Sequence, residues 1–165
     1  MFISNKGVLT LDVRIADEKD LEELAYVHES AFTRQKRSKE WLACTIKAFP
    51  RNLCFVVKNN NKVCGYITWA QKSGFRPEVV LELEQIAIHP NYQNKGIGQT
   101  LIRNSLEQVK DLLLAENSIV KHILVSTRTD NYAQKIYRKV LGAEVEATID
   151  NLFSADEVYM VARNV

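Results

Sequence analysis

An apolar strand that runs through a polar turn into two glycines and then a helix is the feature that most restricts how this chain can fold. It covers residues 81–102, LELEQIAIHPNYQNKGIGQTLI, with Gly96 and Gly98 at the start of the predicted helix. Glycine in a helix costs about 1 kcal/mol relative to alanine, so this pair indicates a strained turn or a group held close to the backbone. Free amides and the positive end of the helix dipole make such a turn suitable for an anion.

Hydrophobic periodicity predicts strands and helices throughout the chain. We expect strands over residues 8–16, 53–59, 62–71, 78–89, 121–127, 143–149 and 157–164, and helices over 17–32, 39–49, 97–115 and 130–142. The second to fourth strands suggest an antiparallel meander, and the strand–helix–strand order after them implies a parallel pair. The predicted fold class is α+β: a mixed, mostly antiparallel sheet of six to seven strands flanked by about four helices.

Composition and charge restrict the class of protein. The 165 residues, 46% of them apolar, predict one domain over residues 1–165 that folds alone. A net charge of +2 gives no reason to expect nucleic acid or a membrane as a partner. The start lacks a signal-peptide pattern and no apolar run reaches the ~18 residues of a membrane helix, so we expect a cytoplasmic protein.

The cysteines and histidines give no sign of a metal site. Cys44, Cys54 and Cys64 are odd in number and lack ligand-like spacing, which argues against a disulfide framework and against zinc. His89 and His122 have no companion ligands nearby in the sequence. We therefore expect no metal.

Two familiar phosphate-binding patterns do not fit the glycine turn. A phosphate loop needs Gly-x-x-x-x-Gly-Lys-Ser/Thr, and the dinucleotide fingerprint needs a third glycine where this chain has Leu101. A Gly-x-Gly pair can also serve only to make a turn. The wider sequence context has to decide between these uses.

That context resembles the GNAT superfamily of N-acetyltransferases. Residues 86–102 are similar to its acyl-CoA binding motif, Gln/Arg-x-x-Gly-x-Gly/Ala, and VSTRTDNYAQKIYRKVLGAE resembles its later motif of an asparagine, a helix with a tyrosine, and a glycine. VRIADEKDLEELAYV and KVCGYITWA resemble its first strand and helix and its third strand. The resemblance covers nearly the whole chain and implies a GNAT-like acyl-CoA N-acyltransferase fold.

The resemblance also implies where acetyl-CoA binds. The glycine turn would hold the pyrophosphate of coenzyme A, and the amides of the preceding strand would polarise the thioester carbonyl. Asn131 can instead cap its own helix. The implied cofactor-binding residues are Ile86, Ala87, Ile88, Gln93, Asn94, Lys95, Gly96, Ile97, Gly98, Gln99, Thr100, Asn131 and Tyr137.

Acetyl transfer to an amine needs a base for the amine and an acid for the departing thiolate. The resemblance implies Tyr137 as the acid, since a phenol of pKa about 10 stays protonated at neutral pH. It implies Glu82 as the base, and Glu84 shares its strand face. Both carboxylates can instead be solvated strand residues, and the tyrosine can be simple packing. Members that acetylate ribosomal-protein N-termini carry a glutamate where this chain has Ser126, which disfavours that activity.

The acceptor site is implied beside residues 33–41, TRQKRSKEW. A basic rim there would favour anionic amines, although such a charge run can be a solvated loop and a histidine on an apolar face can be a core residue. The expected acceptor residues are His28, Arg34, Arg37, Trp41 and Trp69, with Tyr66 and Phe75 as further walls.

The resemblance therefore predicts an N-acetyltransferase that moves an acetyl group from acetyl-CoA to a primary amine of a small molecule or peptide by direct attack in a ternary complex. A protein lysine or N-terminal acetyltransferase is the nearest alternative. A non-catalytic acyl-CoA sensor is an alternative of another class, and a nucleotide-binding regulator is one outside the family. A homodimer is left open.

Overall fold

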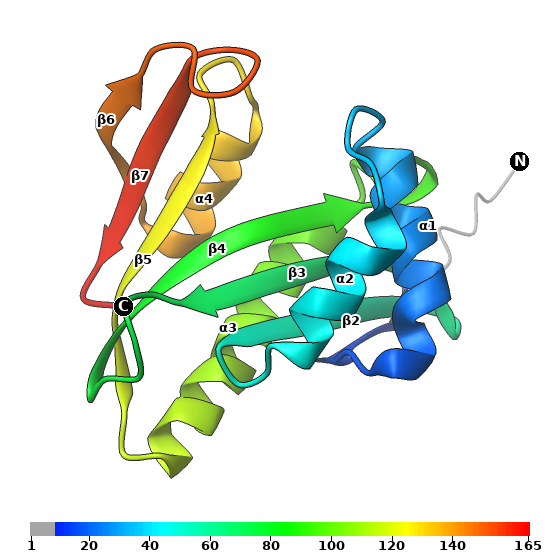
Figure 1. Ribbon diagram of the computed structural model, residues 1–165, viewed down its shortest axis with the longest axis horizontal. Helices are drawn as coiled ribbons and strands as arrows, with labels where there is room; N and C mark the ends of the chain where they lie inside the picture. The colour runs from blue at the N-terminus through cyan, green and yellow to red at the C-terminus, as the bar shows by residue number, and fades with distance from the viewer. Residues whose placement is uncertain (1–8) are drawn as a thin grey trace, which may run out of the picture.

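The computed structural model describes residues 9–165. These residues form one seven-stranded sheet with helices packed against both faces (Figure 1). The strands are β1 (Leu11–Ile15), β2 (Asn52–Asn59), β3 (Lys62–Gln71), β4 (Glu78–Ile88), β5 (Ile119–Arg128), β6 (Glu144–Ile149) and β7 (Glu157–Arg163). The helices are α1 (Leu21–Ala31), α2 (Ser38–Lys47), α3 (Ile97–Ala115) and α4 (Ala133–Leu141), with short 3-10 turns η1 (Glu18–Asp20) and η2 (Pro90–Tyr92).

The sheet has the order β1-β2-β3-β4-β5-β7-β6. Every neighbouring pair in it is antiparallel except β4 and β5, which are parallel. The predicted fold class, with its meander and its single parallel pair, is therefore confirmed. The first strand was expected from residue 8, but Val8 lies outside the described residues and β1 begins at Leu11.

Local sequence explains the meander. β2 and β3 are joined by Asn60 and Asn61, both with positive φ, between the paired residues Asn59 and Lys62. Asparagine tolerates the left-handed conformation, and two such residues form a hairpin turn whose twist suits the strands on either side.

Asp20 ties the first strand and helix together. Its carboxylate accepts two hydrogen bonds of 2.8 Å from Arg14 and lies 3.1 Å from Lys58 Nζ. Burial opposes ionisation, but the bonds from Arg14, the Asp17 amide and Lys58 outweigh it and lower the pKa of Asp20 to about 2. A buried carboxylate thus links β1, β2 and the start of α1.

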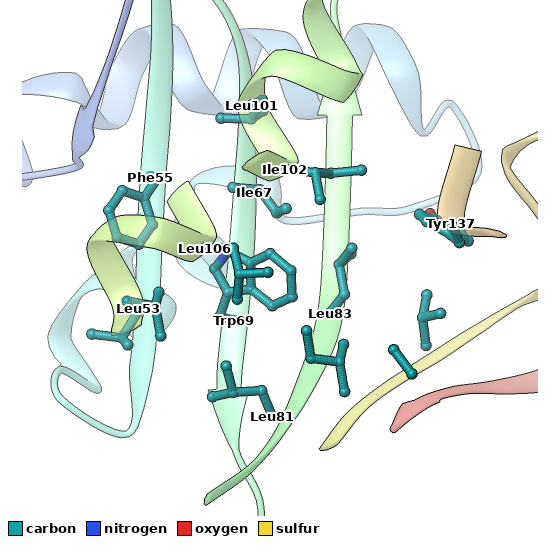
Figure 2. Close-up of a cluster of buried hydrophobic side chains, with 14 of the residues drawn as sticks. Leu53, Phe55, Ile67, Trp69, Leu81, Leu83, Leu101, Ile102, Leu106 and Tyr137 are labelled. Carbon is teal, nitrogen blue, oxygen red and sulfur yellow. The ribbon is translucent and has the colours of Figure 1, made fainter. Parts of the chain in front are cut away.

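Two apolar cores lie on opposite faces of the sheet. One packs α3 and α4 against the strands and contains Phe55, Trp69 and Leu101 (Figure 2). The other packs α1 and α2 against β2, β3 and β4 and contains Val56 and Tyr66. In Figure 1, α1 and α2 lie on the near face and α3 lies behind the sheet. We call these the α1/α2 face and the α3/α4 face.

β4 and β5 pair only along their first halves and then diverge. The last residue of β4 with a partner in β5 is Glu82, opposite Leu124. Beyond it, β4 pairs with β3 alone, and the two strands splay apart toward their carboxyl ends (Figure 1). This gap in the middle of the sheet positions the candidate site.

A β-bulge lies at the start of the gap. Thr68 pairs with Gln85 and Trp69 pairs with Leu83, so β4 has one extra residue there, Glu84. A bulge kinks its strand and redirects a side chain. Here it places Glu84 and Gln85 together on the α1/α2 face, since Leu83 and Ile86 pack on the other core.

Candidate active site

A cavity of about 530 Å³ lies beside the gap, between the end of β4, the start of α3 and the start of α4. Its volume is in the range of a small-molecule or cofactor site. Its lining contains ten of the thirteen residues predicted to bind the cofactor: Ile86, Ile88, Gln93, Asn94, Gly96, Ile97, Gly98, Gln99, Asn131 and Tyr137.

Three predicted residues lie outside this lining. Ala87 packs in the core of the α1/α2 face, and its amide faces β3 by the alternation described below. Lys95 lies over the ring of Tyr92 and donates to Asn91 O. Thr100 Oγ1 donates to Gly96 O at 3.3 Å. The side chains of these three residues pack or bond outside the cavity, and their predicted part in binding the cofactor stays a prediction.

The amino terminus of α3 opens into the cavity. Gly96 precedes the helix with φ of 77°, in the left-handed region that favours glycine. A Cβ built on Gly96 meets no atom within 4 Å, so the space above it is open. Thr100 N is the first amide to bond back, to Gly96 O, which leaves those of Ile97, Gly98 and Gln99 without intrahelical acceptors. This arrangement fits a phosphate group.

The end of β4 presents amides to the gap. His89 N donates to Cys64 O in β3, so by antiparallel alternation the amide of Ala87 also faces β3, and those of Ile86 and Ile88 face away from it. Gln93 Nε2 donates to Ile88 O at 2.9 Å, which fixes the following turn to the strand. Two strand amides are therefore directed toward the place where β5 has left the sheet.

Gly65 allows this strand end to approach β3 closely. It pairs with Ile88, and a Cβ at Gly65 would lie 2.5 Å from Ile88 Cδ1 and 2.7 Å from Ala87 O. Any side chain at this position would push the wall of the cavity outward.

Tyr137 comes from α4 and is only 5% exposed. Burial raises its pKa to about 12, so the phenol is protonated over the whole physiological range. In Figure 2, Tyr137 and Trp69 lie to either side of the β4 ribbon, and both belong to the core of the α3/α4 face. A neutral hydroxyl at the cavity wall can donate a proton.

Asn131 holds the start of α4. Its Oδ1 accepts from Ala133 N at 2.9 Å, and its Nδ2 donates to Thr127 Oγ1 at 2.8 Å. The helix-capping role was one of its two predicted roles. Both side-chain groups are engaged within the protein while the residue lines the cavity.

The predicted bases lie on the α1/α2 face of β4. Glu82 is paired with Lys72, whose Nζ lies 2.6 Å from Glu82 Oε2. Glu84 has no ion-pair partner within residues 9–165 and is solvent-accessible. Partial burial and the neighbouring Glu82 nevertheless raise the pKa of Glu84. Glu84 is therefore the more available proton acceptor.

Of the expected acceptor residues, Trp69 is excluded by its position. It is fully buried on the α3/α4 face, and its indole Nε1 donates to Ser105 Oγ of α3 at 2.9 Å (Figure 2). The prediction that Trp69 lines an acceptor site is therefore wrong. Phe75 is exposed, but it lines a separate cavity of about 680 Å³ with Phe49 and Leu112.

His28 is a buried core histidine. It is 1% exposed, its Nδ1 lies 2.8 Å from Ser38 Oγ, and burial lowers its pKa. Tyr66 is also buried, with its ring 6.4 Å from that of His28. Both residues stay close to the α1–α2 connection without opening onto solvent.

The basic segment is partly neutralised. Arg37 pairs with Glu40, and Lys39 pairs with Glu22. Arg34 is exposed, and Trp41 is 48% exposed on α2. These ion pairs reduce the net positive charge that the segment presents at the expected acceptor site.

The structure adds residues that the sequence did not single out. Tyr132 and Ala133 follow Asn131 directly, and Ile136 precedes Tyr137. Their places beside the asparagine and the tyrosine of the later motif could have predicted that they line the cavity. Gln85 and Gln35, which lie 50 positions apart, are joined by a hydrogen bond that no local pattern indicates.

Two further classes of site are absent from residues 9–165. No group of three or more His, Cys, Asp or Glu residues there is arranged to hold a metal ion. Within the same residues, no helix has the length and apolar character needed to span a membrane.

Comparisons with known proteins agree with this geometry. Among solved structures, the chain is similar to ribosomal-protein-S18-alanine N-acetyltransferase from Escherichia coli (18% identity, TM-score 0.75, 94% of each chain) and to Ard1 from Thermoplasma volcanium (17%, 0.76, 95% of this chain and 99% of that one). It is also similar to yncA, a putative acetyltransferase from Salmonella typhimurium solved with acetyl-CoA (19%, 0.70, 94% of each chain).

At these identities the structures establish the fold alone. A search of curated proteins gave no significant match. The model of the acetyltransferase (GNAT) family, however, matches residues 19–143, well over half of the chain. The chain therefore belongs to the GNAT family of acetyltransferases.

Proposed function

We propose that this acyltransferase moves an acetyl group from acetyl-CoA to a primary amine of a small molecule or peptide by direct attack in a ternary complex. One observation carries the proposal: a single cavity combines the open amino terminus of α3 with the buried phenol of Tyr137. The first suits the phosphates of a coenzyme, and the second suits proton donation to a thiolate.

The donor side fits coenzyme A in its chemistry. The amides of Ile97 to Gln99 and the space above Gly96 would take the pyrophosphate. The amides of Ile86 and Ile88 would hold the thioester carbonyl at the end of β4 and draw electron density from its carbon. The likeness in fold to yncA, which was solved with acetyl-CoA, supports this assignment.

The proton transfers are divided between the two faces of β4. An alkyl ammonium has a pKa of about 10.4, so the amine must lose a proton before it attacks. Glu84, on the α1/α2 face, would accept that proton directly or through a water molecule. Tyr137, on the α3/α4 face, would donate a proton to the departing thiolate.

The charges on the acceptor side favour a cationic amine. Glu84 on this face of β4 has no ion-pair partner within residues 9–165, whereas Arg37 and Lys39 of the basic segment are neutralised by carboxylates, as Glu82 is by Lys72. An ammonium group is attracted to such a surface. The pairing lowers our expectation that anionic amines are the preferred acceptors.

A protein N-terminus is the second candidate acceptor. The Escherichia coli enzyme of similar fold is named for acetylating an alanine of ribosomal protein S18. Against this, the β5 position where the resemblance expects the glutamate of such enzymes is Ser126, which faces Tyr159 in β7. A small molecule or short peptide therefore stays our first choice.

The test is thiol release from acetyl-CoA across a panel of polyamines, amino acids, aminoglycosides and peptides. We expect turnover with at least one amine, and an increase in Tm when acetyl-CoA is added. A rise in Tm without turnover on any amine would support the acyl-CoA sensor instead. Stabilisation by ATP but not by coenzyme A would contradict the donor assignment.

A further inference from the structure

A chain of hydrogen bonds joins the bulge of β4 to the α1–α2 segment, which we define as residues 32–37. Tyr66 Oη donates to Gln85 Oε1 at 2.6 Å, and Gln85 Nε2 donates to Gln35 Oε1 at 3.2 Å. Tyr66 is fully buried in β3, and Gln85 lies beside the bulge residue Glu84. The side chain of Gln85 therefore bridges a fixed point in the sheet and a surface segment.

The buried end of this chain is rigid. Tyr66 packs in the core of the α1/α2 face with Val56 and Ala87. Burial also raises the pKa of Tyr66, so its hydroxyl stays protonated and acts as a donor. Gln85 consequently receives its orientation from the core.

The other end holds a segment that packs on the core through Phe32 but has few polar ties to the sheet. Within residues 9–165, the Gln85–Gln35 bond is the only hydrogen bond between the α1–α2 segment and the sheet. The segment's remaining backbone bonds, such as Gln35 N to Phe32 O, are local. Its other polar contacts run to the adjacent helices, and Arg34 and Lys36 are exposed.

His28 lies against the same junction. Its Nδ1 is 2.8 Å from Ser38 Oγ, just after the segment, and Gln35 is near enough to the imidazole to affect its pKa. Its Nε2 is buried and has no hydrogen-bond partner among residues 9–165. A polar junction of this kind is sensitive to the exact position of Gln35.

We infer that Gln85 is a positioning residue that holds the α1–α2 segment against β4 and so shapes the acceptor side of the site. The link between Gln85 and the acceptor side rests on the proposed function. The tethering of the segment by Gln85 stands on the geometry alone and can be measured without any acceptor.

Trypsin provides that measurement, because Arg34, Lys36 and Arg37 are cleavage sites within the segment. We expect Gln85→Leu to be cut there about 3–10-fold faster than the wild type, the effect of losing one or two ordinary hydrogen bonds on local opening. Tyr66→Phe should act in the same direction. Cleavage sites are identified by mass spectrometry, and Tm shows whether each variant is folded.

Two variants serve as controls. Gln85→Glu should be cleaved by trypsin as slowly as the wild type. Its carboxylate can accept a hydrogen bond from Tyr66, and another from Gln35 once the side-chain amide of Gln35 has flipped to present its NH2 group. Gln108→Leu removes another glutamine bond, from Nε2 to Val13 O, at a site on α3. It should leave cleavage of the segment unchanged even if Tm falls.

Kinetics then test the link to the acceptor. In Gln85→Leu we expect KM for the amine to rise about 3–10-fold while KM for acetyl-CoA is unchanged, and Gln108→Leu should leave both KM values at those of the wild type. Unchanged trypsin cleavage in folded Gln85→Leu overturns the tethering. Faster cleavage with an unchanged amine KM overturns the acceptor role. Absence of turnover in the wild type contradicts the proposed function, and the trypsin result then decides the tethering independently.

Discussion

Lys72 Nζ lies 2.6 Å from Glu82 Oε2, so the first of the two predicted bases is already an ion-pair partner. The carboxylate of Glu82 is therefore engaged before any acceptor amine arrives. The neighbouring Glu84, displaced by the bulge, has no such partner within residues 9–165 and has a raised pKa. Of the two carboxylates on this strand face, Glu82 is held in an ion pair and Glu84, among residues 9–165, is not.

We therefore predict that Glu84→Gln lowers kcat/KM by about 10–100-fold, and that Glu82→Gln lowers it less. Because the pKa of Glu84 is raised, the wild type should lose activity as the pH falls toward and below that pKa, as the base becomes protonated. This acid limb should be absent from the pH–rate profile of Glu84→Gln. A larger loss in Glu82→Gln would reverse the assignment of the base.

Tyr137→Phe should lower kcat by about 10–1000-fold with little change in either KM, since the proton is needed only in the transition state. The phenyl ring preserves the packing of a residue that is 5% exposed, so Tm should stay close to that of the wild type. Steady-state kinetics at saturating acetyl-CoA measure the effect. An unchanged kcat would leave Tyr137 with a packing role alone.

Gly96→Glu should abolish the increase in Tm that acetyl-CoA produces, because the side chain occupies the open space and repels phosphate. Gly74→Glu is the matched control. Gly74 also has a positive φ, of 97°, and open space around it, but it lies in the β3–β4 connection. The control carries a similar backbone strain and should keep the ligand effect, so equal behaviour of the two variants would refute the donor site.

Asp20 should make stability depend on pH in the acid range. Its folded pKa of about 2 is below its ordinary value of 3.8, so its contribution is complete above pH 4 and is lost as the pH falls toward 2. We expect Asp20→Asn to cost about 2 kcal/mol at pH 7 and to flatten this dependence. Asp12→Asn removes the same charge at an exposed position on β1. In urea unfolding measured across this pH range, it should neither lower the stability at pH 7 nor flatten the pH dependence.

The sequence predicted the elements well because their periodicities are long and regular. The glycine turn was predictable for a similar reason, since the backbone there requires a residue that tolerates positive φ. The capping role of Asn131 followed from its place just before a helix. These features depend on neighbours in the chain.

The orientation of Trp69 was not predictable in this way. Nearly every residue of β3 is buried, because both faces of this central strand are covered. The strand therefore lacks the alternation of polar and apolar residues that would assign a side chain to one face. Only the packing of α3 shows that Trp69 lies opposite to Tyr66.

The bulge was hidden for a different reason. Strict alternation puts Glu82 and Glu84 on one face and Gln85 on the other, but the extra residue brings Gln85 to the same face. An extra residue in β4 is defined only by its pairing with β3. The contact between Gln85 and Gln35 depends on that shift and so could not be predicted.

The divergence of β4 from β5 makes a central strand behave like an edge. Alternate amides beyond Glu82 are bonded to β3, while those of Ile86 and Ile88 face the gap. In hydrogen–deuterium exchange, neighbouring amides of one strand should therefore exchange at different rates, with Ile86 and Ile88 the faster. A bound thioester would slow the exchange of these two amides and leave that of Ala87 unchanged. The exchange rates of individual β4 amides would therefore report whether the donor is bound.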